Sequence, residues 1–203
     1  MRAVILSGGR VSDYTYIKNL IQKDDTIICA DSGYNHAVEM GLWPHIIVGD
    51  FDSINKIPTG IPILRFPEKK DFTDTELAID YARDMGFKNF LLLGCIGTRM
   101  DHSITNILLL KGFVERNENA IIQNEHNKIM LTSSTLCLNE DVGGIVSLIP
   151  LQTCSGVCTL GLEYQLRDAV LHVGKGIGIS NIITGCASIS INDGLLLVIV
   201  ARD

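Results

Sequence analysis

The sequence has no long hydrophobic run and no excess of basic residues. No apolar stretch reaches the roughly 18–20 residues that a membrane-spanning helix requires, and the opening residues, MRAVILSGG, are too short for a secretory signal. The formal net charge is −6 with scattered lysines, whereas proteins that bind nucleic acids usually present a basic face. We therefore expect a cytoplasmic protein that binds neither a membrane nor a nucleic acid.

The cysteines lack the spacing of a zinc site. Cys154 and Cys158, the closest pair, are separated by three residues, and no second pair or histidine cluster accompanies them. Three other cysteines lie in the apolar runs IICAD, LLLGC and TLCL, where cysteine behaves as a small hydrophobic residue. We expect buried thiols here.

Up to about residue 125, short apolar runs alternate with helical patterns. The segments are RAVILS, DYTYIKNLIQ, TIICA, SGYNHAVEMG, HIIVGD, IPILRF, TDTELAIDYARDMG, NFLLLG and DHSITNILLLKGFVER. Strands that alternate with helices of about 10–15 residues are typical of βαβ units. Such units form a parallel sheet that is buried on both faces, which explains why the runs are almost entirely apolar.

After about residue 128 the helical period disappears. Seven apolar runs follow, separated by turns that contain glycine and asparagine: KIMLTSS, TLCLN, GGIVSLIPL, GVCTLGLEYQL, AVLHVG, ASISIN and GLLLVIVA. This pattern predicts a small β-sandwich or barrel. The predicted fold class is therefore α/β, with an N-terminal parallel-sheet α/β domain in residues 1–128 followed by a small all-β sandwich or barrel domain in residues 129–203.

Acidic residues follow the predicted strands of the first half. In an open parallel sheet, ligands bind beyond the carboxyl ends of the strands, so these positions are candidates for a site. Carboxylates held close together need a cation to stay ionised, and hard oxygen ligands suit Mg²⁺ together with substrate phosphates. The aspartates at these positions include Asp31, Asp50, Asp52, Asp74 and Asp101, and of these we predict that Asp50 and Asp52 hold magnesium. The i, i+2 spacing of Asp50 and Asp52 lets both reach one ion.

Each of these aspartates, taken alone, has a simpler interpretation. Asp31 and Asp101 precede helical patterns and can cap helices. Thr73 and Glu76 have the spacing of a capping box. The ordered set at one edge of a sheet nevertheless favours a functional site.

Two glycine-containing segments are candidates for phosphate binding. Residues GCIGTR, from Gly94 to Arg99, follow a strand and precede a helix, so backbone N–H groups, the helix dipole and Arg99 can meet an anion. Ser7-Gly8-Gly9 can do the same after the first strand. Neither segment matches the P-loop or the dinucleotide-binding pattern. The alternative for each is a tight turn.

Four motifs occur in order in the first half: Ala30-Asp31-Ser32-Gly33, Gly49-Asp50-Phe51-Asp52-Ser53, Lys70-Asp71-Phe72-Thr73-Asp74-Thr75-Glu76 and Gly97-Thr98-Arg99-Met100-Asp101-His102. Together they resemble the thiamine pyrophosphokinase family in its bacterial form. In the second half, Gly161-Leu162-Glu163-Tyr164-Gln165-Leu166 and Gly178-Ile179-Ser180-Asn181 are similar to the thiamine-binding elements of that family. The resemblance therefore covers nearly the whole chain.

The resemblance implies an enzyme that transfers the diphosphate of ATP to the hydroxyl of thiamine, giving thiamine diphosphate and AMP. It implies that residues 1–128 form the catalytic domain, which binds ATP and Mg²⁺, and that residues 129–203 bind thiamine. It also implies a homodimer whose active site lies between the subunits.

The resemblance also assigns roles to residues. It implies that Mg²⁺ and the ATP phosphates are held by Asp31, Asp50, Asp52, Asp74 and Asp101. It implies that the catalytic residues are Asp50, Asp52, Asp74 and Arg99. Of these, Asp52 or Asp74 is the candidate to orient the thiamine hydroxyl or take its proton. The residues expected to contact ATP and its metal are Ser7, Gly8, Gly9, Asp31, Lys70, Thr73, Gly97, Thr98, Arg99, Asp101 and His102.

Thiamine is expected to contact Tyr164, Ser180 and Asn181. Tyr164 stands where the family often has a tryptophan, and it offers a flat ring for stacking. The alternative is that Tyr164 belongs to the core of the β domain. The only tryptophan, Trp43, lies in the other domain.

Two other functions stay open. IIVGDFDS also resembles the strand-DxD motif of haloacid dehalogenase-type phosphatases, in which Asp50 would attack phosphorus and Asp52 would act as acid and base. Against this, the DxD follows the third strand, and no paired acidic motif follows a later strand in the usual order. The other alternative is a non-catalytic protein that binds a nucleotide or thiamine in the same pockets.

Overall fold

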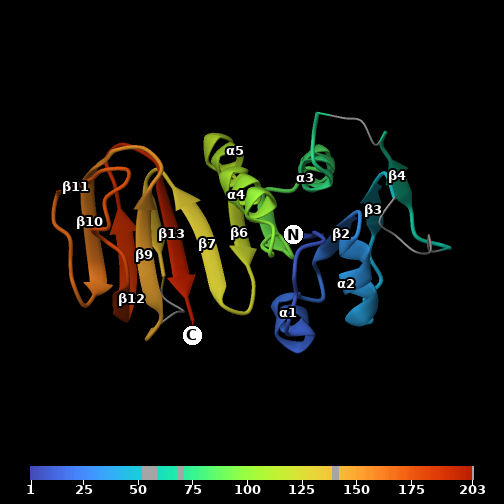
Figure 1. The fold of residues 1–203 in the computed structure, drawn as a ribbon, viewed down its shortest axis with the longest axis horizontal. Coiled ribbons are helices and arrows are strands. Elements are labelled where there is room, and N and C mark those ends of the chain that lie inside the picture. Colours follow the sequence, from blue (N-terminus) through green and yellow to red (C-terminus); the bar gives the residue numbers. More distant parts are fainter. Residues whose placement is uncertain (52–58, 68–70, 139–141, 203) are drawn as a thin grey trace. The chain divides into compact units, whose positions relative to one another are not determined.

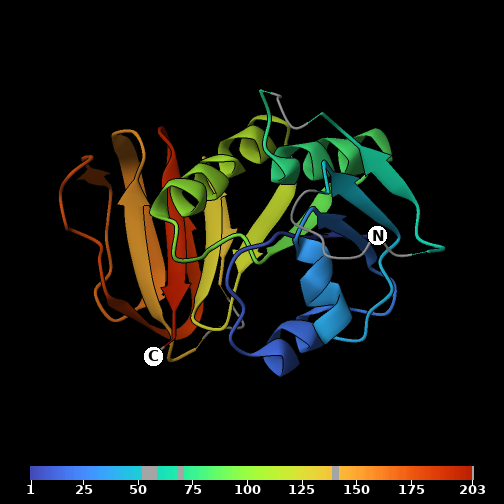
Figure 2. The ribbon, with the colours of Figure 1, turned by 45° about the vertical axis from the view of Figure 1, so that its right-hand side comes forward.

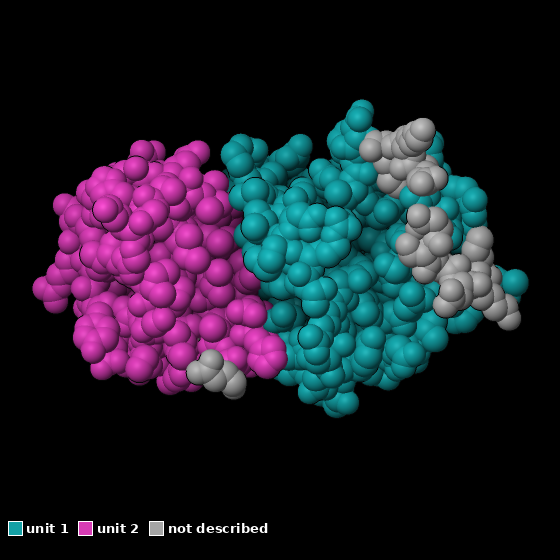
Figure 3. Space-filling view, viewed as in Figure 1, with its two compact units in different colours: residues 1–125 teal, residues 126–203 magenta. Residues whose placement is uncertain are grey.

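The computed structural model of the chain describes residues 1–51, 59–67, 71–138 and 142–202. Asp52 and Lys70 lie outside the described residues. The chain divides into two compact units, residues 1–125 and residues 126–203, which have separate colours in Figure 3. Among the described residues, no helix is both long enough and apolar enough to cross a membrane.

Unit 1 (residues 1–125) is built on a parallel sheet. Its strands are β1 (Ala3–Leu6), β2 (Thr26–Ala30), β3 (Ile46–Gly49), β4 (Ile63–Arg65), β5 (Asn89–Leu93) and β6 (Asn119–Gln123). Its helices are α1 (Tyr14–Leu20), α2 (Gly33–Glu39), α3 (Asp74–Asp84), α4 (Met100–Leu108) and α5 (Leu110–Glu115) (Figure 1). The strands pair in the order β4-β3-β2-β1-β5-β6, and each of these pairs is parallel.

Helices cover both faces of this sheet. α1 and α2 lie on one face, and α3, α4 and α5 lie on the other (Figures 1 and 2). All residues of β1 and β3 are buried for this reason. Because alternate side chains of a strand point to opposite faces, Val4 and Leu6 share one core cluster with Ile17 of α1 and Ala37 of α2. The predicted α/β domain with a parallel sheet is confirmed.

Two elements of unit 1 differ from the prediction. β6 was not expected, because its sequence NAIIQ lacks a continuous apolar run and only Ile122 is fully buried. The single helix expected over DHSITNILLLKGFVER is two helices, α4 and α5, which are separated at Leu109. There the N–H of Gly112 donates to the Leu109 carbonyl, three residues earlier, and glycine weakens a continuous helix.

Unit 2 (residues 126–203) is all-β. Its strands are β7 (Asn127–Thr132), β8 (Thr135–Cys137), β9 (Ile145–Pro150), β10 (Cys154–Leu162), β11 (Ala169–Leu171), β12 (Asn181–Ser190) and β13 (Leu196–Ala201). They pair antiparallel in the order β11-β10-β12-β9-β13-β7, and β8 also pairs with β12. β12 pairs with β9 at its start and with β8 and β10 further on. The predicted all-β second half is confirmed.

Candidate active site

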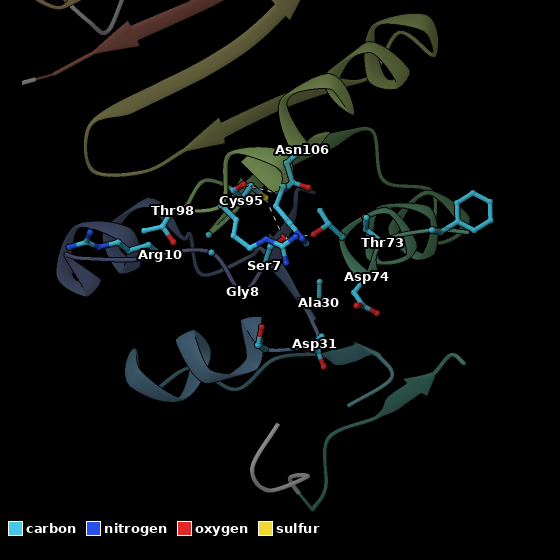
Figure 4. Close-up of a pocket in the computed structure, with 18 of the residues that line it drawn as sticks. Ser7, Gly8, Arg10, Ala30, Asp31, Thr73, Asp74, Cys95, Thr98 and Asn106 are labelled. Carbon is cyan, nitrogen blue, oxygen red and sulfur yellow. Dashed lines mark hydrogen bonds between the residues drawn. The ribbon is translucent and has the colours of Figure 1, made fainter. Parts of the chain in front are cut away.

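β1 is the point at which the strand order of unit 1 reverses. The chain runs from β1 outward to β4 on one side and then returns to β5 on the other side of β1. Ligands of open parallel sheets bind beyond the carboxyl ends of the strands at such a point. A cavity of about 660 Å³ lies there, lined by the segments that follow β1, β2, β3 and β5 and by the start of α3 (Figure 4).

Most residues predicted to bind ATP or its metal line this cavity. They are Ser7, Gly8, Gly9, Asp31, Asp50, Thr73, Asp74, Gly97, Thr98, Arg99 and His102. Asp101 is not among the lining residues, and the predicted positions Asp52 and Lys70 lie outside the described residues. The parallel sheet thus brings together side chains that are far apart in the sequence.

The register of the sheet places the two glycine segments side by side. Leu6 ends β1 and lies opposite Leu93, the last residue of β5. Beyond these residues, the N–H of Ser7 donates to the Leu93 carbonyl at 2.9 Å, and the N–H of Gly9 donates to the Gly94 carbonyl at 2.6 Å. The loop that follows β1 and the loop that follows β5 therefore form one continuous wall of the cavity.

Gly94 is required in this wall for two reasons. Its φ is +65°, in the left-handed region that favours glycine. A Cβ at this position would lie 2.2 Å from the carbonyl oxygen of Ser7. The close approach of the two loops therefore depends on the absence of a side chain at residue 94.

Several backbone N–H groups of these loops are available to an anion. In the part of the chain that the structure describes, the N–H groups of Gly8, Arg10 and Thr98 have no hydrogen-bond partner. All three residues line the cavity, where Figure 4 labels them. Arrays of N–H groups beside a helix start are typical of phosphate sites.

Three of the five predicted metal ligands reach the cavity from three different elements. Asp31 follows β2, is only 8% exposed and has φ +43°, and its N–H donates to the Val48 carbonyl at 2.8 Å. Asp50 follows β3, and Asp74 is the first residue of α3. Figure 4 shows Asp31 and Asp74 at the same cavity.

The start of α3 is fixed by a capping box. Thr73 Oγ1 accepts a hydrogen bond from the N–H of Glu76 at 3.2 Å, and the Glu76 carboxylate accepts one from the N–H of Thr73 at 2.8 Å. The capping role that the sequence indicated for Thr73 is confirmed. Since Thr73 also lines the cavity, the cap holds Asp74 at the cavity wall.

The aspartates share this cavity without forming a metal cage of their own. Within the described ranges, no three His, Cys, Asp or Glu side chains gather closely enough to hold a metal ion. Mg²⁺ usually keeps several waters and takes one or two carboxylates together with substrate phosphates. Hard carboxylate oxygens beside N–H groups that have no partner in the described chain fit that kind of site.

Arg99 and Asp101 form an exposed ion pair at the start of α4. The Arg99 Nε donates to Asp101 Oδ1 at 3.2 Å, and Nη2 donates to Oδ2 at 2.5 Å. The hydrogen bonds from Arg99 lower the pKa of Asp101 to about 2, and the same contacts raise the pKa of Arg99. Asp101 thus contacts Arg99 rather than facing the cavity with the other aspartates.

A buried polar cluster lies at the base of the cavity. The Ser7 hydroxyl shares a 2.9 Å hydrogen bond with the Thr75 hydroxyl, and the Cys95 thiol donates to Ser7 Oγ at 3.4 Å. Burial raises the pKa of the Cys95 thiol to about 12, so it remains protonated. These contacts join the ends of β1 and β5 to the first turn of α3.

The residues predicted to bind thiamine lie in unit 2. The Tyr164 side chain is exposed, at 69%, so the alternative that it belongs to the core is wrong. The Asn181 amide accepts from the Tyr164 N–H at 3.0 Å and donates to the Tyr164 carbonyl at 2.5 Å. Ser180 has φ +58°, and its N–H donates to Ser147 Oγ at 3.1 Å. Asn181 therefore fixes the backbone that carries the exposed tyrosine ring.

Sequence reasoning missed two lining residues, Arg10 and Asn106. Six further lining residues lie in motifs or segments that the sequence analysis singled out, without a role of their own: Ala30, Ser32, Phe72, Thr75, Gly94 and Cys95. Asn106 had a signal in the sequence, since it lies four residues after His102 and therefore on the same face of α4. Its amide donates to the Cys95 carbonyl at 2.8 Å. Arg10 also had one, because it directly follows the predicted Ser7-Gly8-Gly9 segment.

Two protein-family models match the sequence of this chain. The model described as "Thiamin pyrophosphokinase, catalytic domain" matches residues 17–122. The model described as "Thiamin pyrophosphokinase, vitamin B1 binding domain" matches residues 133–196. The chain belongs to the thiamine pyrophosphokinase family.

Individual members of the thiamine pyrophosphokinase family agree with this assignment. The chain is 30% identical over 186 residues to the thiamine pyrophosphokinase of Bacillus subtilis (strain 168), covering 87% of each protein. It is 29% identical over 185 residues to thiamin pyrophosphokinase 1 of Caenorhabditis elegans, covering 82% of this chain and 75% of the relative.

Solved structures of thiamine pyrophosphokinases have the same fold. The crystal structure of the enzyme from Bacillus subtilis superimposes with a TM-score of 0.91 at 24% identity and full coverage of both chains. That from Geobacillus thermodenitrificans gives a TM-score of 0.87 at 25% identity, covering 100% of this chain and 98% of the other. The resemblance stated from the sequence motifs is confirmed. The phosphohydrolase and the non-catalytic binding protein gain no support from these comparisons.

Proposed function

We propose that this protein transfers the diphosphate group of ATP to the primary hydroxyl of thiamine. The hydroxyl oxygen attacks the β-phosphorus of ATP, and a new O–P bond forms. The bond from the β-phosphorus to the oxygen that bridges the α- and β-phosphorus atoms breaks. AMP leaves and keeps that bridging oxygen. The hydroxyl proton is lost, and the products are thiamine diphosphate and AMP.

One observation carries the proposal for the site. The carboxylates of Asp31, Asp50 and Asp74 share the cavity at the strand-order reversal with the N–H groups of Gly8 and Thr98. Transfer between phosphates is catalysed mainly by positioning and by neutralising charge. A cavity that offers N–H donors for phosphate oxygens beside carboxylates for a cation suits that chemistry.

We infer that Mg²⁺ accompanies ATP in this cavity. The residues that would hold it are Asp31, Asp50, Asp52 and Asp74, with Asp101 included in the prediction from the motifs. When bound, the ion neutralises charge on the triphosphate. The donor set supports this proposal, since carboxylate oxygens are the ligands that Mg²⁺ prefers in proteins.

The protein's own groups have distinct proposed roles. Asp52 or Asp74 orients the thiamine hydroxyl or takes its proton. The guanidinium group of Arg99 contacts the phosphates, and its hydrogen bonds to Asp101 hold it in place. The remaining proposed contacts with ATP come from Ser7, Gly8, Gly9, Lys70, Thr73, Gly97, Thr98 and His102.

We further propose that the two parts of the chain bind different substrates. Residues 1–128 bind ATP and carry the catalytic groups, and residues 129–203 bind thiamine. Tyr164 stacks on a thiamine ring, and Ser180 and Asn181, which is hydrogen-bonded to the Tyr164 backbone, add polar contacts. The exposure of the Tyr164 ring supports this role.

The assembly is proposed from the family resemblance, and the location is proposed from the sequence. We propose a homodimer in which the active site lies between subunits. We also propose that the protein works in the cytoplasm, where ATP is available.

A product assay tests the proposed reaction. Purified protein is mixed with ATP, Mg²⁺ and thiamine, and the products are separated by chromatography. We expect AMP and thiamine diphosphate in equal amounts, and we expect Asp52→Asn to lose most turnover while folding normally. Inorganic phosphate as the main product would favour a phosphohydrolase, and the absence of AMP would favour a binding protein.

A further inference from the structure

His36 of α2 contacts the loop that follows β1 and is not among the residues that line the cavity. Its Nε2 lies 2.7 Å from the Gly9 carbonyl oxygen, and its Nδ1 lies 2.9 Å from the Tyr14 hydroxyl. The rings of His36 and Tyr14 are 5.7 Å apart between centroids and inclined at 47°. His36 also approaches the second loop, because a Cβ at Gly94 would lie 3.4 Å from His36 Cδ2. One side chain therefore bonds to the first glycine loop and lies next to the second.

The hydrogen bonds define which nitrogen of the neutral His36 imidazole carries the proton. A carbonyl oxygen only accepts, so His36 Nε2 carries the proton and donates to Gly9. In the neutral ring, Nδ1 then accepts from the Tyr14 hydroxyl. Burial, followed by the charge of Glu39, raises the pKa of Tyr14, so its hydroxyl keeps its proton. Tyr14, His36 and Gly9 thus form a chain of donors that ends on the loop backbone.

This contact sets the direction of N–H groups at the cavity. In a trans peptide, the carbonyl and the next N–H point in opposite directions. Fixing the Gly9 carbonyl on His36 therefore turns the N–H of Arg10 away from α2. On the other side of Gly9, its own N–H is held by the Gly94 carbonyl at 2.6 Å. Both peptide planes at Gly9 are thereby fixed, although glycine is otherwise the most flexible residue.

We propose that His36 and Tyr14 are positioning residues that hold the Gly8–Arg10 backbone in the conformation that binds the phosphates of ATP. The N–H of Arg10, which has no partner among the described residues, is the donor that this arrangement orients. The N–H of Gly8, also without a partner there, belongs to the same loop. The inference rests on the proposed function, because it takes ATP as the ligand of the cavity. Neither side chain is among the residues that line the cavity, so both act through the backbone.

The test separates the two hydrogen bonds of the imidazole. His36→Gln keeps an N–H able to reach the Gly9 carbonyl, whereas His36→Asn is too short to do so. Tyr14→Phe removes only the hydroxyl. A matched control is His45→Gln, because Nδ1 of His45 accepts from the Ile27 N–H at 3.0 Å at the opposite, amino end of the sheet.

The measurements are the dissociation constant of Mg²⁺-ATP by calorimetry and the separate KM values for ATP and thiamine. A neutral hydrogen bond contributes about 0.5–1.5 kcal/mol, which corresponds to about a 2- to 12-fold change in affinity. We expect His36→Asn to weaken ATP binding and raise the KM for ATP toward the upper end of that range. The KM for thiamine is expected to stay unchanged. His36→Gln and Tyr14→Phe are expected to fall between His36→Asn and the wild type.

Each outcome decides the question. Wild-type ATP affinity in folded His36→Asn and Tyr14→Phe would overturn the proposal, and so would a fall in kcat with ATP affinity unchanged. If His36→Asn fails to fold, Tyr14→Phe and His36→Gln carry the test. A wild-type protein that binds ATP but makes no thiamine diphosphate would refute the proposed function, while the affinity comparison still decides the role of His36. A wild-type protein that does not bind ATP would refute both.

Discussion

Asp74 combines two positions, because it is the first residue of α3 and also lines the cavity. Asp74→Asn keeps the shape of the side chain and removes its charge. We expect kcat/KM to fall by about 10²-fold or more, as for the loss of a catalytic acid–base or charge-stabilising group. The thermal unfolding midpoint is expected to stay close to that of the wild type, since the Thr73 cap remains.

The matched control for Asp74 is on the same helix. Asp84→Asn removes an exposed carboxylate from the last residue of α3, away from the cavity. Steady-state kinetics should find it close to wild type. Equal activity in the two variants would contradict the role proposed for Asp74.

Gly94 tests the close contact between the two loops. Gly94→Ala places a Cβ in a left-handed residue, 2.2 Å from the Ser7 carbonyl oxygen. The backbone conformation alone costs about 1–2 kcal/mol, and relieving the clash costs about 1–3 kcal/mol more. We expect a loss of about 2–5 kcal/mol in the free energy of unfolding by denaturant, together with a raised KM for ATP.

Gly86 supplies the control for this substitution. Its φ is +87°, but a Cβ there would meet nothing within 4 Å. Gly86→Ala should therefore show only the conformational cost, about 1–2 kcal/mol, with unchanged KM for ATP. If both variants lose the same stability, the loop contact at Gly94 is not the cause.

For single residues, most of those that line the cavity could be predicted from the sequence, but their hydrogen-bond partners could not. Acidic and glycine residues at strand ends were predictable, because a parallel sheet gathers those ends on one edge. The contact between His36 and the Gly9 carbonyl was not, since it joins residues on different elements whose spacing carries no periodic signal. The contacts of Thr75 and Cys95 with Ser7 were unpredictable for the same reason, because they exist only in the folded sheet.

Among the elements, the end of β6 is tied to the start of α1 by Glu125. Its carboxylate accepts hydrogen bonds from the N–H of Ser12, from the Ser12 hydroxyl at 2.8 Å and from the N–H of Asp13 at 2.7 Å. Partial burial raises the pKa of Glu125, but the hydrogen bonds outweigh it and leave the pKa at about 2. The carboxylate therefore stabilises the folded state only while it is ionised.

This lowered pKa predicts a loss of stability in acid. The unfolded chain has the ordinary glutamate pKa of about 4.3, so the contribution of Glu125 is fully present above that pH. It is lost as the pH falls toward about 2. Glu125→Gln removes the titration, so the difference in unfolding free energy between wild type and variant should shrink from pH 6 to pH 3. A difference that is independent of pH would contradict this assignment.

The order of elements was largely predictable, and the exceptions have physical causes. Strands buried on both faces give continuous apolar runs, which is why β1, β2, β3 and β5 were visible in the sequence. β6 is only partly buried, and its short mixed sequence gave no such run. The division into α4 and α5 occurs inside one apolar helical pattern, so periodicity could not reveal it.

For the whole molecule, the change of pattern in the sequence corresponds to a change of architecture. The boundary between the compact units in the sequence falls between residues 125 and 126, and the two family models match on either side of this point. Strand–helix alternation and short turn-bounded strands produce different folds, so the change of periodicity in the sequence separated them. The proposed homodimer had no such signal in the sequence.

The proposed homodimer predicts a definite mass in solution. Light scattering coupled to size exclusion should give twice the chain mass of 22.2 kDa. If the active site lies between subunits, activity per chain should fall when dilution dissociates the dimer. A monomer with full specific activity would contradict the shared site.

The central claim is that the cavity at the reversal of strand order binds ATP and its metal ion. A crystal structure with Mg²⁺, a non-hydrolysable ATP analogue and thiamine tests this most directly. We predict the triphosphate against the N–H groups of the loops that follow β1 and β5, with a carboxylate of Asp50 or Asp74 on the metal or one of its waters. A nucleotide bound elsewhere, with both loops free of phosphate, would contradict the account.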